Sequence, residues 1–328
     1  MPTTITIPHL GSFNAGRGLV ALDRCSDGRF VVGRDGVSAV AATADGKVEF
    51  VAFATHALAY VRSSMGYPAY YPVQPVRLRR PVKAVLMDLD GTSVRSEEFW
   101  MWMIELTTAS LLGDPGFRLA DDDRPFVAGH SVSEHLQHCI RRYCPAKTVE
   151  EARRHYFEHM REQMRLIMDG KGRAEAFSPT PGLKEFLLEL RSRGVLIALV
   201  TSGIYEKAYP EILAAFRTMG LGAPAQFYDA IVTAGFPLRR GEVGTLGELS
   251  PKPHPWLYAE ACRVGLGLSV EEREQVVGIE DSAAGVCAIR LAGFAAVGLT
   301  GGNIAEGGAT PLCEVVAPSL QEALAAIL

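Results

Sequence analysis

The chain has 328 residues, of which 48% are hydrophobic, and its formal net charge is −4. This length favours about two domains, and the weak negative charge argues against a general surface for nucleic acid. No apolar run is long enough to span a membrane, and the N-terminus has no signal-peptide pattern. The six cysteines form no Cys-x-x-Cys pair, which favours free thiols in a reducing compartment. We therefore expect a soluble cytoplasmic protein.

Residues 1–66 are predicted to form a small β-rich module. Asp-Gly pairs begin at Asp27, Asp35 and Asp45, and Asp-Gly is a strong hairpin signal. The segments LVALDR, RFVVG, VSAVAAT and KVEFVAF predict a four-strand meander, and a short helix is expected over 57–64. Residues 67–81 are rich in proline and tyrosine and predict an extended linker. Two roles stay open for the module: oligomerisation or packing, and the binding of a ligand or partner.

The most informative stretch is VKAVLMDLDGT, residues 82–92. Its apolar run predicts a buried parallel strand. Asp88 and Asp90 then lie at the carboxyl end of that strand, where open α/β sheets bind ligands. Two carboxylates this close repel each other unless a cation or a shared proton compensates, and Mg²⁺ takes oxygen ligands while keeping positions open for phosphate. Taken alone, the motif is also consistent with a turn that has a calcium-like ligand pattern.

Residues 96–180 have a helical pattern, with helices predicted over 97–112, 130–143 and 149–168. The strand VLIALVTS, residues 195–202, then ends in Thr201 and Ser202. These hydroxyl groups can donate to a phosphate oxygen, or they simply end the strand in a turn. In SPKPHP, residues 250–255, Lys252 lies between two prolines that limit its backbone freedom. A lysine there can neutralise both a phosphoryl group and a carboxylate, although most loop lysines are only solvated.

A further apolar strand, VVGIEDS over residues 276–282, ends in Glu280 and Asp281. Paired acids at a buried strand end are costly without a cation. Asp281 or Ser282 can also cap the helix that follows. Strands over 295–299 and 314–317 and a helix over 319–328 complete a doubly wound parallel sheet.

The four motifs occur in the order Asp-x-Asp-Gly-Thr, Thr/Ser, Lys and Glu-Asp. In this order they resemble the motifs of the haloacid dehalogenase-like (HAD) hydrolase superfamily, over about residues 82–328. The resemblance implies a Rossmann-like α/β core, residues 82–95 and 181–328, with an inserted helical cap of the C1, subfamily I type over 96–180. It also implies that Asp88 attacks phosphorus to form an aspartyl-phosphate. Asp90 is then the general acid and base, and Lys252 neutralises charge.

The resemblance also implies the residues that bind metal and substrate. The implied Mg²⁺ ligands are Asp88, the Asp90 backbone carbonyl, and Glu280 or Asp281. The implied substrate- and phosphate-binding residues are Gly91, Thr92, Thr201 or its near alternative Ser202, His130 and Ser131. His130 and Ser131 are included because AGHSVSEHL, residues 128–136, matches the substrate-specificity loop of the family's cap.

We expect a Mg²⁺-dependent hydrolase of small phosphomonoesters, with two alternatives. A β-phosphoglucomutase-like mutase is disfavoured because Trp100 and Val132 stand where such mutases carry His and Arg. A binding or regulatory protein is disfavoured because the catalytic acids are retained. The expected partner is a small phosphorylated metabolite, without nucleic acid or membrane, and the N-terminal module is a candidate for homo-oligomerisation or partner binding.

Overall fold

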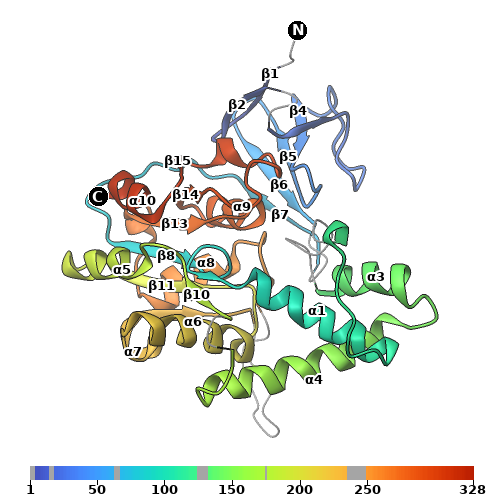
Figure 1. Cartoon of the computed structure of the whole chain (residues 1–328). Coiled ribbons are helices and arrows are strands. Elements are labelled where there is room, and N and C mark those ends of the chain that lie inside the picture. The colour runs from blue at the N-terminus through green and yellow to red at the C-terminus, as the bar shows by residue number, and fades with distance from the viewer. Residues whose placement is uncertain (1–3, 15–17, 63–66, 124–131, 174–175, 235–248) are drawn as a thin grey trace, which may run out of the picture. The chain divides into compact units, whose positions relative to one another are not determined.

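The computed structural model describes residues 4–14, 18–62, 67–123, 132–173, 176–234 and 249–328 (Figure 1). The chain divides into two compact units. One contains Met1–Ser93, Pro181–Tyr205 and Ala225–Leu328, and the other contains Val94–Thr180 and Glu206–Pro224. The N-terminal residues therefore belong to the same unit as the α/β core. The finer division into module, linker and core stays a prediction.

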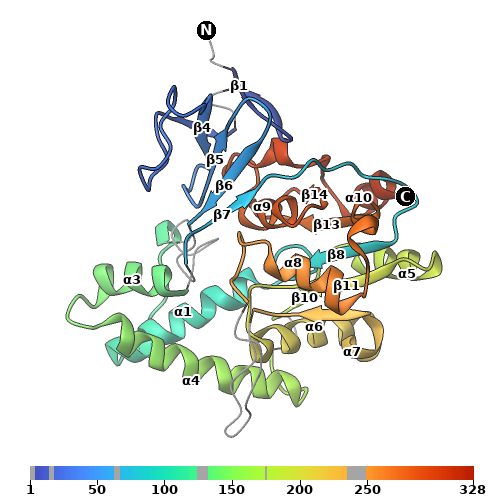
Figure 2. The ribbon, with the colours of Figure 1, turned by 180° about the vertical axis from the view of Figure 1, so that it is seen from behind.

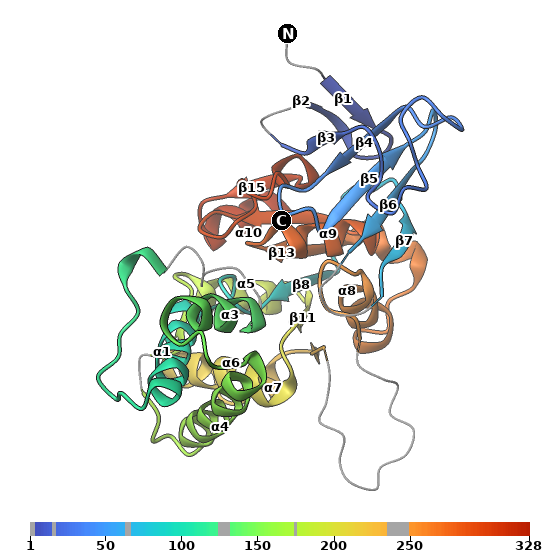
Figure 3. The same ribbon diagram turned by 90° about the vertical axis from the view of Figure 1, so that its right-hand side faces the viewer.

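The core of the first unit is a six-stranded sheet in the order β12-β11-β8-β13-β14-β15, in which every pairing is parallel. All residues of β8, β13 and β14 are buried, as expected where helices cover both faces of a parallel sheet. Figure 3 shows α5 and α10 on one face and α8 and α9 on the other. The predicted doubly wound α/β core is confirmed. The strands are β8 (Ala84–Asp88), β11 (Leu196–Val200), β12 (Ala230–Val232), β13 (Val276–Glu280), β14 (Ala295–Leu299) and β15 (Val315–Ala317), and the helices are α5 (Leu183–Ser192), α7 (Pro224–Phe227), α8 (Trp256–Glu260), α9 (Ala283–Leu291) and α10 (Leu320–Ile327).

The N-terminal residues form a five-stranded antiparallel sheet in the order β3-β4-β5-β6-β7, which Figure 2 shows from behind. The helix predicted over 57–64 is wrong, because β6 is a strand whose residues alternate between buried and half-buried, the period of a strand rather than a helix. The predicted strand RFVVG is reduced to one bridge between Arg24 and Val31, and β7 lies inside the segment predicted as a linker. The strands are β3 (Val20–Leu22), β4 (Ala39–Ala42), β5 (Val48–Ala52), β6 (Ala57–Val61) and β7 (Ala69–Pro72), and a separate hairpin consists of β1 (Thr4–Ile7) and β2 (Gly11–Asn14).

The N-terminal sheet shares one hydrophobic cluster with the α/β core. Phe50 and Val61 of the sheet are buried in the same cluster as Leu257, Tyr258 and Val286 of the core. Burial of these side chains removes apolar area from water on both sides of the contact, so it stabilises the sheet and the core together.

We expect Phe50→Ala to lower the free energy of unfolding by about 3–5 kcal/mol, because it removes a ring that is 1% exposed from this shared cluster. The matched control is Val20→Ala on β3, where the side chain is 48% exposed and the expected change is within about 0.5 kcal/mol. Urea unfolding followed by circular dichroism measures both. An early transition in the Phe50 variant that leaves the α/β core folded would show that the N-terminal sheet is an independent domain.

The second unit is mainly helical, and two of its three predicted helices have the predicted bounds. The third begins at Val132, after residues 124–131, which lie outside the described part. Helix α1 ends at Gly113 with a φ of 68°, and α4 begins with a capping box between Thr148 and Glu151. None of the helices in the described ranges is long and apolar enough to cross a membrane. The elements are β9 (Val94–Arg95), α1 (Glu97–Leu112), α3 (Val132–Tyr143), α4 (Val149–Met168), β10 (Ser178–Pro179) and α6 (Tyr205–Met219).

A fully buried aspartate fastens α3 to the preceding chain. Asp123 Oδ1 lies 2.7 Å from His138 Nε2 and accepts from Arg142 NH1 at 2.8 Å. Its Oδ2 accepts from the Tyr143 hydroxyl and from Ala120 N. Burial raises the pKa of Asp123, but these donors outweigh it and hold the pKa below its usual value.

We expect Asp123→Asn to destabilise the protein by about 3 kcal/mol at pH 7, because it breaks a buried charge cluster. Because its pKa is lower in the folded state, the Asp123 carboxylate stabilises the protein fully above its unfolded pKa of about 4. This stabilisation is lost as the pH falls through the pKa of the folded state. The difference from wild type should therefore shrink between pH 7 and pH 3 in thermal or urea unfolding. Asp122→Asn, on a neighbouring residue whose side chain is 70% exposed, is the control. An equal effect of both variants would contradict this account.

Candidate active site

The candidate site lies where three neighbouring strands end. Asp88 is the last residue of β8 and is paired with Val200, the last residue of β11. On the other side of β8, Met87 is paired with Ile279, so Glu280 ends β13 at the same edge of the sheet. Apolar runs of similar length therefore bring the polar residues that follow them together at one edge.

Lys252 lies between two acidic side chains. Its Nζ donates to Asp88 Oδ1 at 2.5 Å, to Glu280 Oε1 at 2.6 Å and to the Val200 carbonyl at 3.1 Å. Only 7% of the Lys252 side chain is exposed. Burial alone would lower the pKa of Lys252, but Asp88 and Glu280 reverse this and raise the pKa well above its usual value. The lysine is therefore a fixed positive charge beside the Asp88 carboxylate.

Glu280 is fully buried, and both of its oxygens accept hydrogen bonds. Its Oε1 accepts from Tyr258 at 2.8 Å in addition to Lys252. Its Oε2 accepts from Ser282 N at 3.1 Å and from Ser282 Oγ at 2.9 Å. At position 285 only glycine fits, since a Cβ there would lie 1.8 Å from Glu280 Oε1. These contacts fix Glu280 as the anchor of Lys252.

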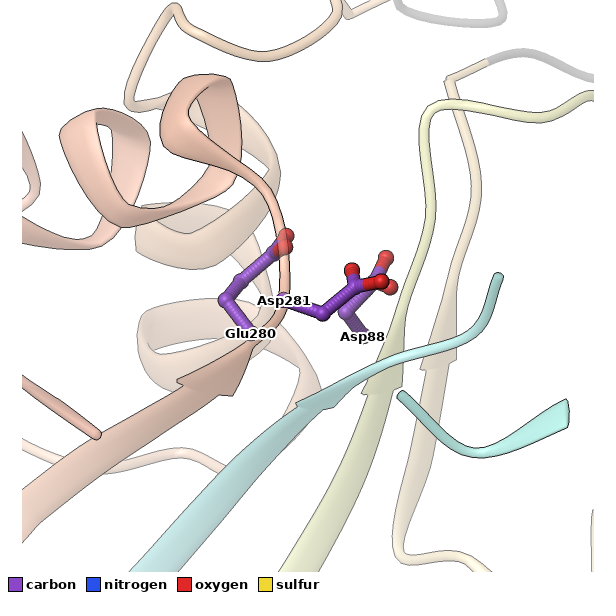
Figure 4. Close-up of side chains that lie close together, drawn as sticks. All are labelled: Asp88, Glu280 and Asp281. Atoms are coloured by element: carbon purple, nitrogen blue, oxygen red, sulfur yellow. The ribbon is translucent and has the colours of Figure 1, made fainter. Parts of the chain in front are cut away.

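Asp281 is more open than its neighbour. Its Oδ1 lies 3.5 Å from the Thr92 hydroxyl, and a Cβ at Gly91 would lie 2.0 Å from its Oδ2. Burial, together with the charge of Glu280, raises the pKa of Asp281 to about 7, and the same two causes raise the pKa of Asp88 well above its usual value. Figure 4 shows the side chains of Asp88 and Asp281 extending toward each other from the ends of β8 and β13.

This arrangement fits a divalent cation. Each of Asp88, Glu280 and Asp281 offers an oxygen within 4.8 Å of the others. When ionised, the three carboxylates carry three negative charges against the single ammonium of Lys252, which leaves an excess of two negative charges in a largely buried site. Burial, together with the negative charge of Glu280, raises the pKa values of Asp88 and Asp281. A hard cation with oxygen ligands, such as Mg²⁺, matches both the charge and the donor atoms.

The other predicted residues differ in how the structure places them. Asp90 is half-buried, two residues beyond the strand end. Thr201 Oγ1 accepts from Gly203 N at 2.9 Å, whereas Ser202 Oγ accepts from the Lys252 backbone N–H at 3.1 Å and so holds the lysine segment. His130 and Ser131 lie outside the described residues.

Two side chains at this site, Tyr258 and Ser282, escaped prediction as site residues. Both bind Glu280. Tyr258 stands in an apolar helical stretch where a core residue is the ordinary interpretation, and its contact depends on how α8 packs beside β13. Ser282 is predicted only as a helix cap, and it caps α9 while it also donates to Glu280.

An aspartate pair, a buried lysine and an acidic strand end at one edge of a doubly wound parallel sheet define a class of α/β proteins with a carboxylate centre. Within that class, residues 82–293 match the model of the haloacid dehalogenase-like hydrolase family. The chain therefore belongs to that family, as its motifs predict, and the expectation of a hydrolase is confirmed.

Individual relatives agree with this assignment. The chain is 29% identical over 236 residues to the validoxylamine A 7′-phosphate phosphatase of Streptomyces hygroscopicus subsp. limoneus, over 68% of this chain and 88% of the relative. Its fold is similar to that of CbbY from Rhodobacter sphaeroides in complex with phosphate, with 20% identity, a TM-score of 0.52 and coverage of 74% of this chain and 96% of CbbY. A proposed β-phosphoglucomutase from Thermotoga maritima is similar too, with 21% identity, a TM-score of 0.52 and coverage of 75% and 98%.

We expect Gly91→Ala to weaken Mg²⁺ binding by roughly 10-fold or more, because the new methyl group displaces the Asp281 carboxylate. Titration calorimetry with Mg²⁺ measures the affinity. The matched control is Gly28→Ala, since Gly28 has a similar φ of 76° against 81° at Gly91, but a Cβ at Gly28 meets nothing within 4 Å. Both variants have the same backbone strain, so equal affinities would show that Asp281 does not bind the metal.

Proposed function

We propose that this hydrolase is a Mg²⁺-dependent phosphatase of small phosphomonoesters that acts through an aspartyl-phosphate at Asp88. The observation that carries the proposal is the buried Asp88 carboxylate, held 2.5 Å from Lys252 Nζ and faced by Asp281. A carboxylate is a nucleophile that requires no separate base for the first step. The similarity to the validoxylamine A 7′-phosphate phosphatase supports the same chemistry.

In the proposed first step, Oδ2 of Asp88, the oxygen opposite the one that accepts from Lys252, forms a bond to phosphorus while the ester oxygen departs and takes a proton from Asp90. In the second step, Asp90 accepts a proton from water as that water attacks the phosphorus, which releases inorganic phosphate and restores Asp88. The Lys252 ammonium opposes the rise in the pKa of Asp88 and stabilises the charge on the phosphoryl oxygens. The Thr201 hydroxyl and the backbone N–H groups of Gly91 and Thr92 are the proposed donors to those oxygens.

Mg²⁺ would be held by Asp88, Asp281 and the Asp90 backbone carbonyl. We favour Asp281 over Glu280 as the direct ligand, because both Glu280 oxygens already accept protein donors. When bound, the cation neutralises the repulsion between the Asp88 carboxylate and an anionic phosphoryl group. Glu280 instead fixes Lys252, so the two adjacent acids have different roles.

We expect the protein to release inorganic phosphate from at least one ester in a panel of small phosphomonoesters, and only with Mg²⁺. Asp88→Asn should lower this rate by at least about 10³-fold because it removes the nucleophile. Asp23→Asn makes the same change at an exposed residue of the N-terminal module and should leave the rate unchanged. Removal of Mg²⁺ by a chelator should abolish release, and its restoration should recover it.

Two results would contradict the proposal. Interconversion of sugar phosphates without net phosphate release would indicate the mutase alternative. The absence of both reactions across the panel, with the protein folded and Mg²⁺ bound, would indicate a binding protein that retains the fold.

A further inference from the structure

The segment that carries Lys252 has few backbone contacts of its own. Three of the six residues Ser250–Pro255 are prolines, which have no N–H to donate. The Lys252 N–H donates to Ser202 Oγ, and the His254 N–H donates to the Pro251 carbonyl at 3.1 Å. The position of the lysine therefore depends on side chains that hold the segment from outside.

One such side chain comes from the N-terminal sheet. The Tyr71 hydroxyl, on β7, lies 2.8 Å from Nδ1 of His254, two residues beyond Lys252. It also accepts a hydrogen bond from Trp256 Nε1 at 3.1 Å. His254 is 1% exposed, and its ring meets the Tyr71 ring edge to face, with centroids 5.8 Å apart. Figure 3 shows β7 running beside α8, the helix that begins at Trp256.

Apolar packing reinforces this link. Tyr71 packs against the cluster that contains Leu257 and Tyr258, the two residues after Trp256. Tyr258 in turn donates to Glu280, which accepts from Lys252. The N-terminal sheet thus contacts the lysine segment by a polar route through His254 and by an apolar route through α8.

We propose that Tyr71 is a positioning residue for Lys252, so that the N-terminal sheet, which precedes the family-matched residues 82–293, is a working part of the hydrolase site. Tyr71 touches no reacting group. It holds His254, which fixes the direction in which the Lys252 ammonium meets Asp88. The expected effect of Tyr71 on turnover rests on the proposed phosphatase activity. The expected effect of Tyr71 on the order of the Lys252 segment does not.

The first test compares Tyr71→Phe with Tyr70→Phe. Both remove one hydroxyl from β7, but the Tyr70 hydroxyl donates to Asp27 within the N-terminal module, at 2.7 Å. A small misplacement of Lys252 acts on the transition state, so Tyr71→Phe should lower kcat roughly 10-fold with KM changed by less than about twofold. Tyr70→Phe should leave both constants within about twofold of wild type. Equal losses in the two variants would overturn the proposal.

A second test asks whether Tyr71 acts through the lysine. In a Lys252→Met background, Tyr71→Phe should have no further effect on the residual rate, because residues that act as one unit are not additive. His254→Leu should reproduce the loss of Tyr71→Phe, and His254→Asn, which keeps a polar atom near the Nδ1 position, should restore most of the rate. Additive losses would show that Tyr71 acts elsewhere.

A third readout is independent of activity. Hydrogen exchange of the peptide that contains the Lys252 and His254 amides should be faster in Tyr71→Phe than in wild type or Tyr70→Phe, while other core peptides are unchanged. Faster exchange in a protein that releases no phosphate would support the anchor and reject the phosphatase. Unchanged exchange with phosphatase activity intact would reject the anchor alone.

Discussion

The structure depends on one shared charge, the Lys252 ammonium held between Asp88 and Glu280. A buried ammonium is expensive unless its partners satisfy it, and here two carboxylates and a backbone carbonyl do so. The three partners come from the ends of β8, β13 and β11. The lysine therefore links the strand ends on which the site is built, and any change that moves one strand end changes the environment of Asp88.

The two adjacent acids at the end of β13 have the same charge but different surroundings. Glu280 is enclosed by Tyr258, Ser282 and the close approach of Gly285, and it accepts from Lys252. Among the described residues, Asp281 lies 3.5 Å from the Thr92 hydroxyl, and burial together with the charge of Glu280 raises its pKa to about 7. A divalent cation matches this more open carboxylate in charge and in donor atoms.

Strand ends are what the sequence predicts well here. Short apolar runs followed by Asp88, Thr201 and Asp281 predict the strands of the core, because parallel strands bury both faces. They also predict that these polar residues gather at one edge, where the carboxyl ends of the strands meet. The N-terminal sheet is predicted less well: β6 is mistaken for a helix because the alanines and the leucine of ALAYV favour helices, and β7 is mistaken for a linker because of the prolines around it. Both become strands through tertiary pairing and through burial against α8 and α9, which no local pattern encodes.

The same limit explains why Tyr71, His254 and Tyr258 escape a motif-based interpretation. Each is a common residue type, and its role arises only from a tertiary contact. Tyr71 and His254 are 183 residues apart in sequence, and Tyr258 and Glu280 are 22 apart. A proline-rich segment can present a lysine without backbone pairing only if something outside it supplies the missing constraints. In this chain part of that constraint comes from a sheet that precedes the family core. The surroundings of Lys252 therefore include the surface of the N-terminal sheet that meets its segment.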